Sequence, residues 1–167
     1  MSSPVLSEEA VPDLRTQSAP AAENSIAILL VGPFDSRRGT LREIFAPPHW
    51  EIREAATYAE AVGMLNNPRI AVTICDTEIA EGNWQVLLAD LQRRANPPNF
   101  IVSSRLADER LWAEVLNLGG YDVLVQPLDR REVLRVTYMA WLAWRQKITV
   151  TDGGDTRRFE RASDAAA

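Results

Sequence analysis

Three polar residues that could do chemistry each come directly after a short apolar run: Asp76, Ser103 and Gln126. Continuous apolar runs are typical of strands buried on both faces, and in an open parallel sheet ligands bind beside the carboxyl ends of the strands. A carboxylate at the end of a buried strand is costly unless it is hydrogen-bonded or used by a ligand. Asp76 therefore either caps the following turn or belongs to a binding site at this edge of the sheet.

The elements that must position these residues alternate along the chain. Apolar runs predict five strands, of which the second is polar enough for a sheet edge. The predicted strands are 26–31, 50–53, 70–75, 100–102 and 123–125. Stretches with helical periodicity lie between them. This alternation predicts an α/β fold, in which right-handed crossovers give an open parallel sheet with helices on both faces.

Local signals mark where the helices begin and end. Four residues precede predicted helices and can accept hydrogen bonds from a first turn; they are Asp35, Thr57, Asp108 and Asp129. Gly119-Gly120, after the helical stretch 109–118, is typical of a helix C-terminus. The last helix is expected to end at residue 147.

Composition excludes several classes of function. The chain has 167 residues, a net charge of −5, one cysteine (Cys75) and one histidine (His49). A single cysteine excludes an internal disulfide and a multi-cysteine zinc site, and a single histidine disfavours histidine-centred catalysis. The acidic balance argues against binding to nucleic acid. No apolar run could cross a bilayer and no leader opens the chain, so we expect a cytoplasmic protein with no membrane partner.

The composition also divides the chain into three parts. Residues 1–25 are rich in proline and small polar residues, which predicts a disordered N-terminal arm. Residues 26–147 form the expected domain, of ordinary size. Residues 148–167, which contain Gly153 and Gly154, are expected to form a flexible C-terminal tail that is too short for an output domain with its own core.

Four segments of the expected domain carry a resemblance to a known family. They are Ile-Leu-Leu-Val at 28–31, Thr-Ile-Cys-Asp-Thr-Glu-Ile-Ala-Glu-Gly at 73–82, Pro-Pro-Asn-Phe-Ile-Val-Ser-Ser at 97–104, and Leu-Gly-Gly-Tyr-Asp-Val-Leu-Val-Gln-Pro-Leu at 118–128. In this order and spacing they resemble the receiver domain of two-component response regulators. The resemblance implies a flavodoxin-like, doubly wound five-stranded sheet in the order 2-1-3-4-5 with five helices. It puts Asp76 at the phosphoacceptor position and Ser103 at the position that senses the phosphoryl group.

Three departures from the receiver pattern bear on this chemistry. Gly32 and Pro33 stand where receivers have the acidic pair that holds Mg²⁺, and neither has a side-chain oxygen to offer. Gln126 replaces a lysine, and an amide donates hydrogen bonds but brings no positive charge. Val123 replaces the aromatic residue that acts as a switch in many receivers. Because phosphoryl transfer depends on cations that neutralise the transferred group, these departures imply an atypical pseudo-receiver with a poor acceptor.

Our preferred hypothesis is a stand-alone, non-enzymatic signalling protein of a two-component system. It needs no cofactor or metal and acts by contact with a protein partner, such as a histidine kinase or a downstream regulator, or as a homodimer through the last helix. Aromatic residues are frequent interface anchors, and the candidates are Trp112, Tyr138, Trp141 and Trp144. The helical spacing of the last three suits packing on the sheet equally well.

Two alternatives stay open. In the first, a histidine kinase phosphorylates Asp76, with Glu78 or Asp35 as substitute ligands for weakly bound Mg²⁺ and Arg105 as the nearest cation. The second is of another class, a flavodoxin-type protein that binds a cofactor.

Overall fold

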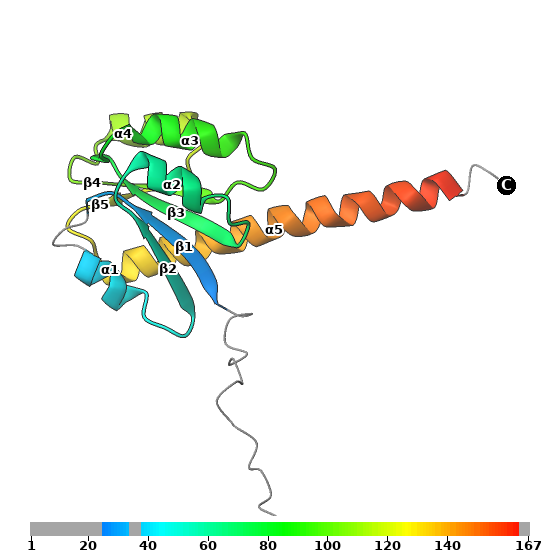
Figure 1. The fold of residues 1–167 in the computed structure, drawn as a ribbon, viewed down its shortest axis with the longest axis horizontal. Coiled ribbons are helices and arrows are strands. Elements are labelled where there is room, and N and C mark those ends of the chain that lie inside the picture. Colours follow the sequence, from blue (N-terminus) through cyan, green and yellow to red (C-terminus); the bar gives the residue numbers. More distant parts are fainter. Residues whose placement is uncertain (1–24, 34–37, 164–167) are drawn as a thin grey trace, which may run out of the picture.

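The computed structural model describes residues 25–33 and 38–163, and at 38, 39 and 151–163 it describes the backbone alone. The predicted cap Asp35 and all of the predicted N-terminal arm except Ser25 lie outside the described residues. Strands and helices alternate along the described chain (Figure 1). They are β1 (Ile26–Val31), α1 (Arg38–Ile44), β2 (Trp50–Ala55), α2 (Tyr58–Met64), β3 (Ile70–Asp76), α3 (Trp84–Gln92), β4 (Asn99–Ser104), α4 (Glu109–Asn117), β5 (Asp122–Val125) and α5 (Arg130–Ser163).

The described strands form one parallel sheet in the order β2-β1-β3-β4-β5, which confirms the predicted fold class. The second strand of the chain lies at an edge of the sheet, as its polarity predicted. Register brings the carboxyl ends of the inner strands together, since Val31 pairs with Cys75 and Asp76 pairs with Ser103. The sequence therefore places its polar strand ends along one edge of the sheet.

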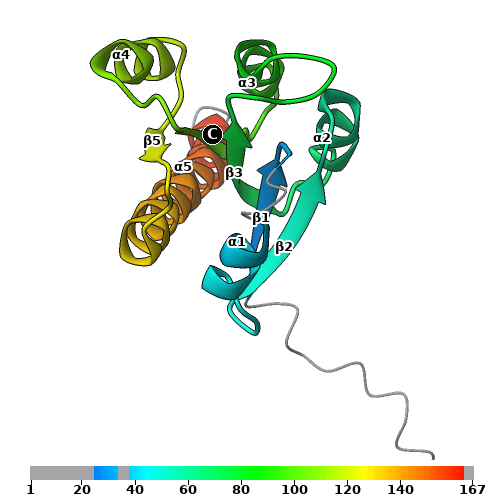
Figure 2. The same cartoon turned by 90° about the vertical axis from the view of Figure 1, so that its left-hand side faces the viewer.

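Helices cover both faces of the sheet (Figures 1 and 2). Helices α1 and α5 pack on one face, around Phe45 and Val133, while α2, α3 and α4 pack on the other, around Leu88 and Val115. Every residue of β1 and β3 is buried. Burial on both faces explains why these strands are mostly apolar and do not alternate between polar and apolar residues.

The predicted helix signals are found where the structure describes them. A side-chain oxygen at each cap accepts a hydrogen bond from the backbone N–H three residues later: Thr57 (3.2 Å), Asp108 (2.9 Å) and Asp129 (3.0 Å). Asn83 caps α3 in the same way at 2.8 Å, which we did not predict from the sequence. Gly119, which follows the C-cap Leu118 of α4, has φ 89°, a conformation that favours glycine.

The structure corrects the predicted end of the last helix. We expected the helix to stop at residue 147, but α5 continues to Ser163. Each added residue of an existing helix gains one backbone hydrogen bond, and this offsets the cost of about 1 kcal/mol for each of Gly153 and Gly154. Even with this length, α5 does not qualify as a membrane span, and neither does any other helix within the described residues.

Candidate functional site

The candidate site lies where β3 and β4 end side by side. Asp76 is the last residue of β3, and its side chain is buried. Ser103 pairs with it in the register of β4 and is also buried. A backbone hydrogen bond also joins the ends of β3 and β4, because the Thr77 N–H donates to the Ser103 carbonyl at 3.1 Å. A carboxylate and a hydroxyl are thus held next to each other inside the protein.

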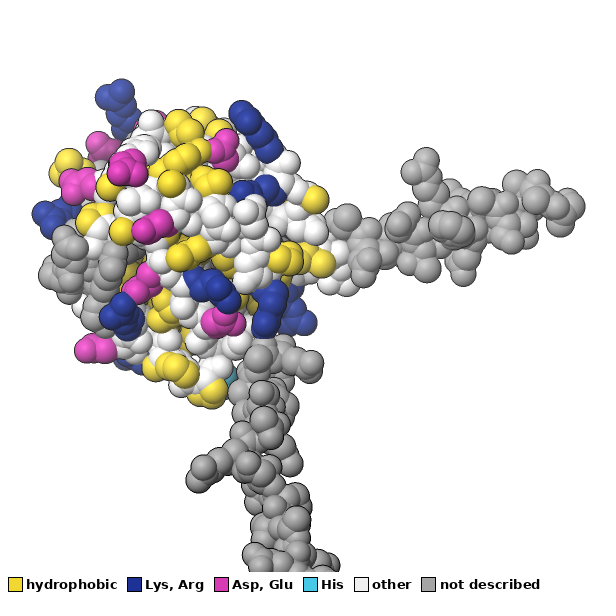
Figure 3. Space-filling view, in the orientation of Figure 1, with side chains coloured by type: hydrophobic (Ala, Val, Ile, Leu, Met, Phe, Trp, Pro, Cys, Tyr) yellow, Lys and Arg dark blue, Asp and Glu magenta, His cyan; other side chains and the backbone are white. Residues whose placement is uncertain are grey.

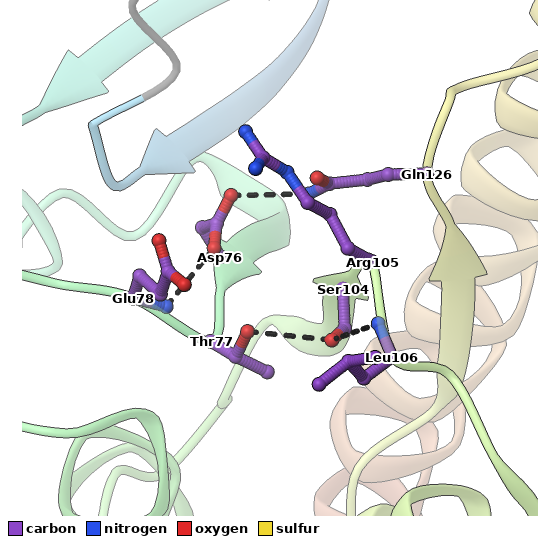
Figure 4. A pocket seen from close by; sticks show the side chains of 7 residues that line it. All are labelled: Asp76, Thr77, Glu78, Ser104, Arg105, Leu106 and Gln126. Carbon is purple, nitrogen blue, oxygen red and sulfur yellow. Dashed lines mark hydrogen bonds between the residues drawn. The ribbon is translucent and has the colours of Figure 1, made fainter.

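Gln126 joins these two groups from a third strand. It follows β5 directly, and its backbone N–H donates to the Ser104 carbonyl at 2.9 Å. Its side-chain Nε2 donates to Asp76 Oδ2 at 3.0 Å and to Ser103 Oγ at 2.8 Å. A primary amide has two N–H donors, so one nitrogen can make both bonds. The buried amide therefore links the ends of β3, β4 and β5, and Figure 4 shows its bond to Asp76.

The other oxygen of Asp76 caps the turn that follows the strand. Asp76 Oδ1 accepts a hydrogen bond from the Glu78 backbone N–H at 2.9 Å. The structure thus confirms the turn-capping interpretation of this carboxylate, and it also shows the side chain in a polar cluster with Gln126. With each oxygen hydrogen-bonded, a buried carboxylate avoids most of its desolvation cost.

A second set of hydrogen bonds lies beside the first. The Thr77 hydroxyl donates to Ser104 Oγ at 3.4 Å, and the same oxygen accepts the Leu106 backbone N–H at 3.1 Å. We did not single out Thr77 or Leu106 from the sequence. The position of Thr77 directly after Asp76 could have indicated that it lies in the site. Leu106 takes part only through its backbone N–H, and its residue type gives no sign of this role.

These residues line a pocket of about 290 Å³ (Figure 4). In Figure 4 the Arg105 side chain runs past the Gln126 amide toward Asp76. Arg105 and Glu78 are exposed, so they form the outer part of the pocket, while Asp76 and Gln126 form its buried end. The lining residues are Asp76, Thr77, Glu78, Ser104, Arg105, Leu106 and Gln126.

The described residues do not fit a resident magnesium ion. Gly32 and Pro33 follow β1 without any side-chain oxygen, and Gly32 has φ 135°, which disfavours any side chain at that position. Both oxygens of Asp76 already accept hydrogen bonds from N–H donors. Within the described ranges, no group of three His, Cys, Asp or Glu side chains could hold a metal. Asp35, one of the two substitute ligands that we considered, lies outside these ranges.

Cys75 lies next to the site but on the other face of the strand. It is buried among apolar residues of the sheet, in the cluster around Leu88. Burial raises the pKa of its thiol well above the usual range, and the charge of Asp76 raises it further. The residue therefore stays a neutral thiol and packs as a small buried hydrophobe.

The aromatic interface candidates differ in burial. Trp112 of α4 and both Trp141 and Trp144 of α5 are half-buried and pack against the core, and the Trp144 Nε1 hydrogen is buried without an acceptor. Tyr138 is 47 % exposed, with its ring centroid 5.4 Å from that of Trp141. The Arg145 guanidinium lies 4.8 Å from the centre of the Trp141 ring. Of the four candidates, Tyr138 presents the most accessible ring.

Comparisons with known proteins locate similar folds. No protein-family model matches the sequence, and no curated protein is significantly similar to it. Solved structures do match. The signal receiver domain of an HD domain-containing protein from Pseudomonas fluorescens Pf-5 has a TM-score of 0.69 at 20% identity, and the match covers 75% of this chain and 93% of that one.

Two further structures agree with this result. A CheY-like response regulator receiver domain protein from Methanospirillum hungatei JF-1 has a TM-score of 0.66 at 17% identity, over 74% of this chain and 98% of that one. The chemotaxis response regulator CheY4 of Vibrio cholerae has a TM-score of 0.63 at 16% identity, over 70% and 98%. At these identities the similarity shows the fold, which is that of CheY-like receiver domains.

Proposed function

We propose that this chain is an atypical receiver of a two-component signalling system, which acts through contact with a protein partner and does not require phosphorylation. The observation that carries this proposal is the double hydrogen bond of the Gln126 amide to Asp76 and Ser103. The proposed phosphoacceptor and the proposed sensing hydroxyl are already joined to each other by a neutral group. The pocket can hold its arrangement without a phosphoryl group.

Charge supports the same conclusion. A phosphoryl group brings negative charge that transferring enzymes and receivers neutralise with metal ions and cationic side chains. At the buried end of this pocket the available groups are a carboxylate, a hydroxyl and an amide, none of which is cationic. Loss of such charge stabilisation costs several kcal/mol in a transition state, or roughly a thousandfold in rate. Asp76 is therefore a poor phosphoacceptor, and the protein needs neither a metal nor a catalytic residue.

The proposed partner is a protein, such as a histidine kinase, a downstream regulator or a second copy of this chain. Figure 2 shows α4, β5 and α5 side by side at one edge of the sheet. Large apolar side chains are exposed on these elements or, for Leu118, directly after α4: Leu116, Leu118, Val125, Tyr138 and Met139. Exposed apolar groups close together are typical of protein interfaces. Figure 3 shows acidic, basic and apolar side chains interspersed over the face that it draws, which suits a protein partner better than nucleic acid.

One observation favours the alternative that Asp76 is phosphorylated. Arg105 lines the pocket and, in Figure 4, extends over it toward Asp76. A guanidinium at this place could pair with a phosphoryl group and supply part of the missing positive charge. Arg105 is exposed, however, and screening by water weakens such a contribution compared with that of a buried lysine.

Incubation with acetyl phosphate and Mg²⁺, followed by intact-mass spectrometry, separates the two functions. We expect the mass of the wild-type protein to stay unchanged, because the pocket stabilises the transferred group poorly. A gain of one phosphoryl group that disappears in Asp76→Asn and weakens in Arg105→Ala would establish the phosphoacceptor function instead. A gain that persists in Asp76→Asn would report another site and leave our proposal standing.

A further inference from the structure

We infer that Gln126 is a positioning residue, whose amide holds the connection between β4 and α4 in one arrangement by bonding Asp76 and Ser103 together. The inference deepens the proposed function and rests on it, because it names the residue that sets the state of a receiver without phosphate. Any conformation that a partner reads on α4 would then depend on residue 126.

The amide is well placed for this role because it is a single group shared by three strand ends. Its bonds of 3.0 Å to Asp76 and 2.8 Å to Ser103 are short enough to fix both side chains. Gln126, Asp76 and Ser103 are at most 7% exposed, so water cannot readily replace a lost partner. Hydrogen bonds between buried groups cost the most when one partner is removed.

The segment that leads to α4 follows Ser103 directly in the chain and has hydrogen bonds of its own. Ser104, next to Ser103, accepts the Leu106 N–H on its side chain and the Gln126 N–H on its carbonyl. Asp108, two residues after Leu106, caps the first turn of α4. Residues 104–108 thus connect the cluster of Asp76, Ser103 and Gln126 to the start of α4. If residue 126 no longer bonds Ser103, this short connection is the part of the chain expected to loosen first.

Two substitutions at position 126 distinguish the effect of hydrogen bonding from the effect of packing. Gln126→Met keeps nearly the same length and shape but has no N–H donor. Gln126→Lys has several donors and can bond both oxygens again. If the role of Gln126 were merely to fill space, methionine would serve as well as glutamine. If its role is to donate, lysine restores the wild-type state and methionine does not.

Amide hydrogen–deuterium exchange of the purified full chain tests the inference. In Gln126→Met we expect exchange in peptides that contain Glu78 and Leu106 to rise about fivefold, while exchange in β1 and β2 stays as in the wild type. Gln126→Lys should return the rates to wild-type values. The matched control is Gln85→Met, which removes an exposed amide bond to Glu114 between α3 and α4 and should leave both peptides unchanged.

Three outcomes would overturn the inference: unchanged exchange in Gln126→Met, equally increased exchange over the whole chain, or a failure of lysine to restore the rates. If the methionine variant does not fold, Ser103→Ala replaces it, because this variant removes the other partner of the same hydrogen bond; unchanged exchange in the peptide that contains Leu106 would then contradict the inference. The proposed function is tested by a different measurement. It fails if adding acetyl phosphate and Mg²⁺ changes hydrogen–deuterium exchange in the same peptides of the wild-type protein.

Discussion

A variant that combines Pro33→Asp with Gln126→Lys is expected to be phosphorylated by acetyl phosphate in the presence of Mg²⁺ about a hundredfold faster than the wild type. The variant gains a carboxylate beside the end of β3 and an ammonium next to Asp76 and Ser103. A cation and a metal ligand that act on the transferred group contribute roughly 3 kcal/mol to its transition state, which corresponds to this factor. The rate is measured by intact-mass spectrometry over time.

Gly32 is left unchanged in this variant for a structural reason. Its φ of 135° strains any other residue, and its N–H donates to the Ala55 carbonyl at 3.0 Å. The control carries Asp76→Asn in addition and should stay unmodified. A double variant that is folded but no faster than the wild type would show that positions 33 and 126 do not correspond to the metal and cation positions of receivers.

Trp144→Ala is expected to lower the free energy of unfolding by about 3 kcal/mol, the low end of the range for a buried tryptophan. The Trp144 side chain packs against the core beneath α5 but is only half-buried, so we expect a loss of stability at the low end of this range. Trp144→Phe should cost less, because it also removes the indole N–H that is buried without an acceptor. Urea unfolding followed by circular dichroism gives both values.

Tyr138→Ala is the matched control on the same helix. Its ring is 47 % exposed, so the change should leave the free energy of unfolding within about 0.5 kcal/mol of the wild type. If Trp144→Ala were equally harmless to stability but reduced self-association in sedimentation experiments, Trp144 would be an interface anchor and its packing role would be refuted.

Burial on both faces made the sheet predictable from the sequence. Run 26–31 is apolar throughout and run 70–75 is apolar except for Thr73, because helices cover both sides of the sheet. Short runs of this kind between helical stretches are typical of central parallel strands. Helix caps were predictable where a polar side chain and the first turn are close in sequence, as for Thr57 and Asp129. Each of these features depends on local sequence or on a simple period.

Features that depend on contacts between distant residues were not predictable. The sequence marked Asp76, Ser103 and Gln126 as strand ends, but it could not show that one amide bonds the other two, since 50 residues separate Gln126 from Asp76. The continuation of α5 past residue 147 was missed for a local reason instead, because glycines and charges usually accompany a helix end. The burial of Trp144 depends on how α5 rotates against the sheet, and its spacing from Trp141 allowed either face.

The most direct test of the central claim is a titration of the wild-type protein with Mg²⁺ and beryllofluoride, a mimic of the phosphoryl group, followed by amide NMR. We predict that the signals of Glu78, Ser103 and Leu106 keep their positions through the millimolar range, because Gln126 already holds the carboxylate and the hydroxyl together. Saturable shifts of these signals at millimolar or lower Mg²⁺, absent in Asp76→Asn, would contradict the claim.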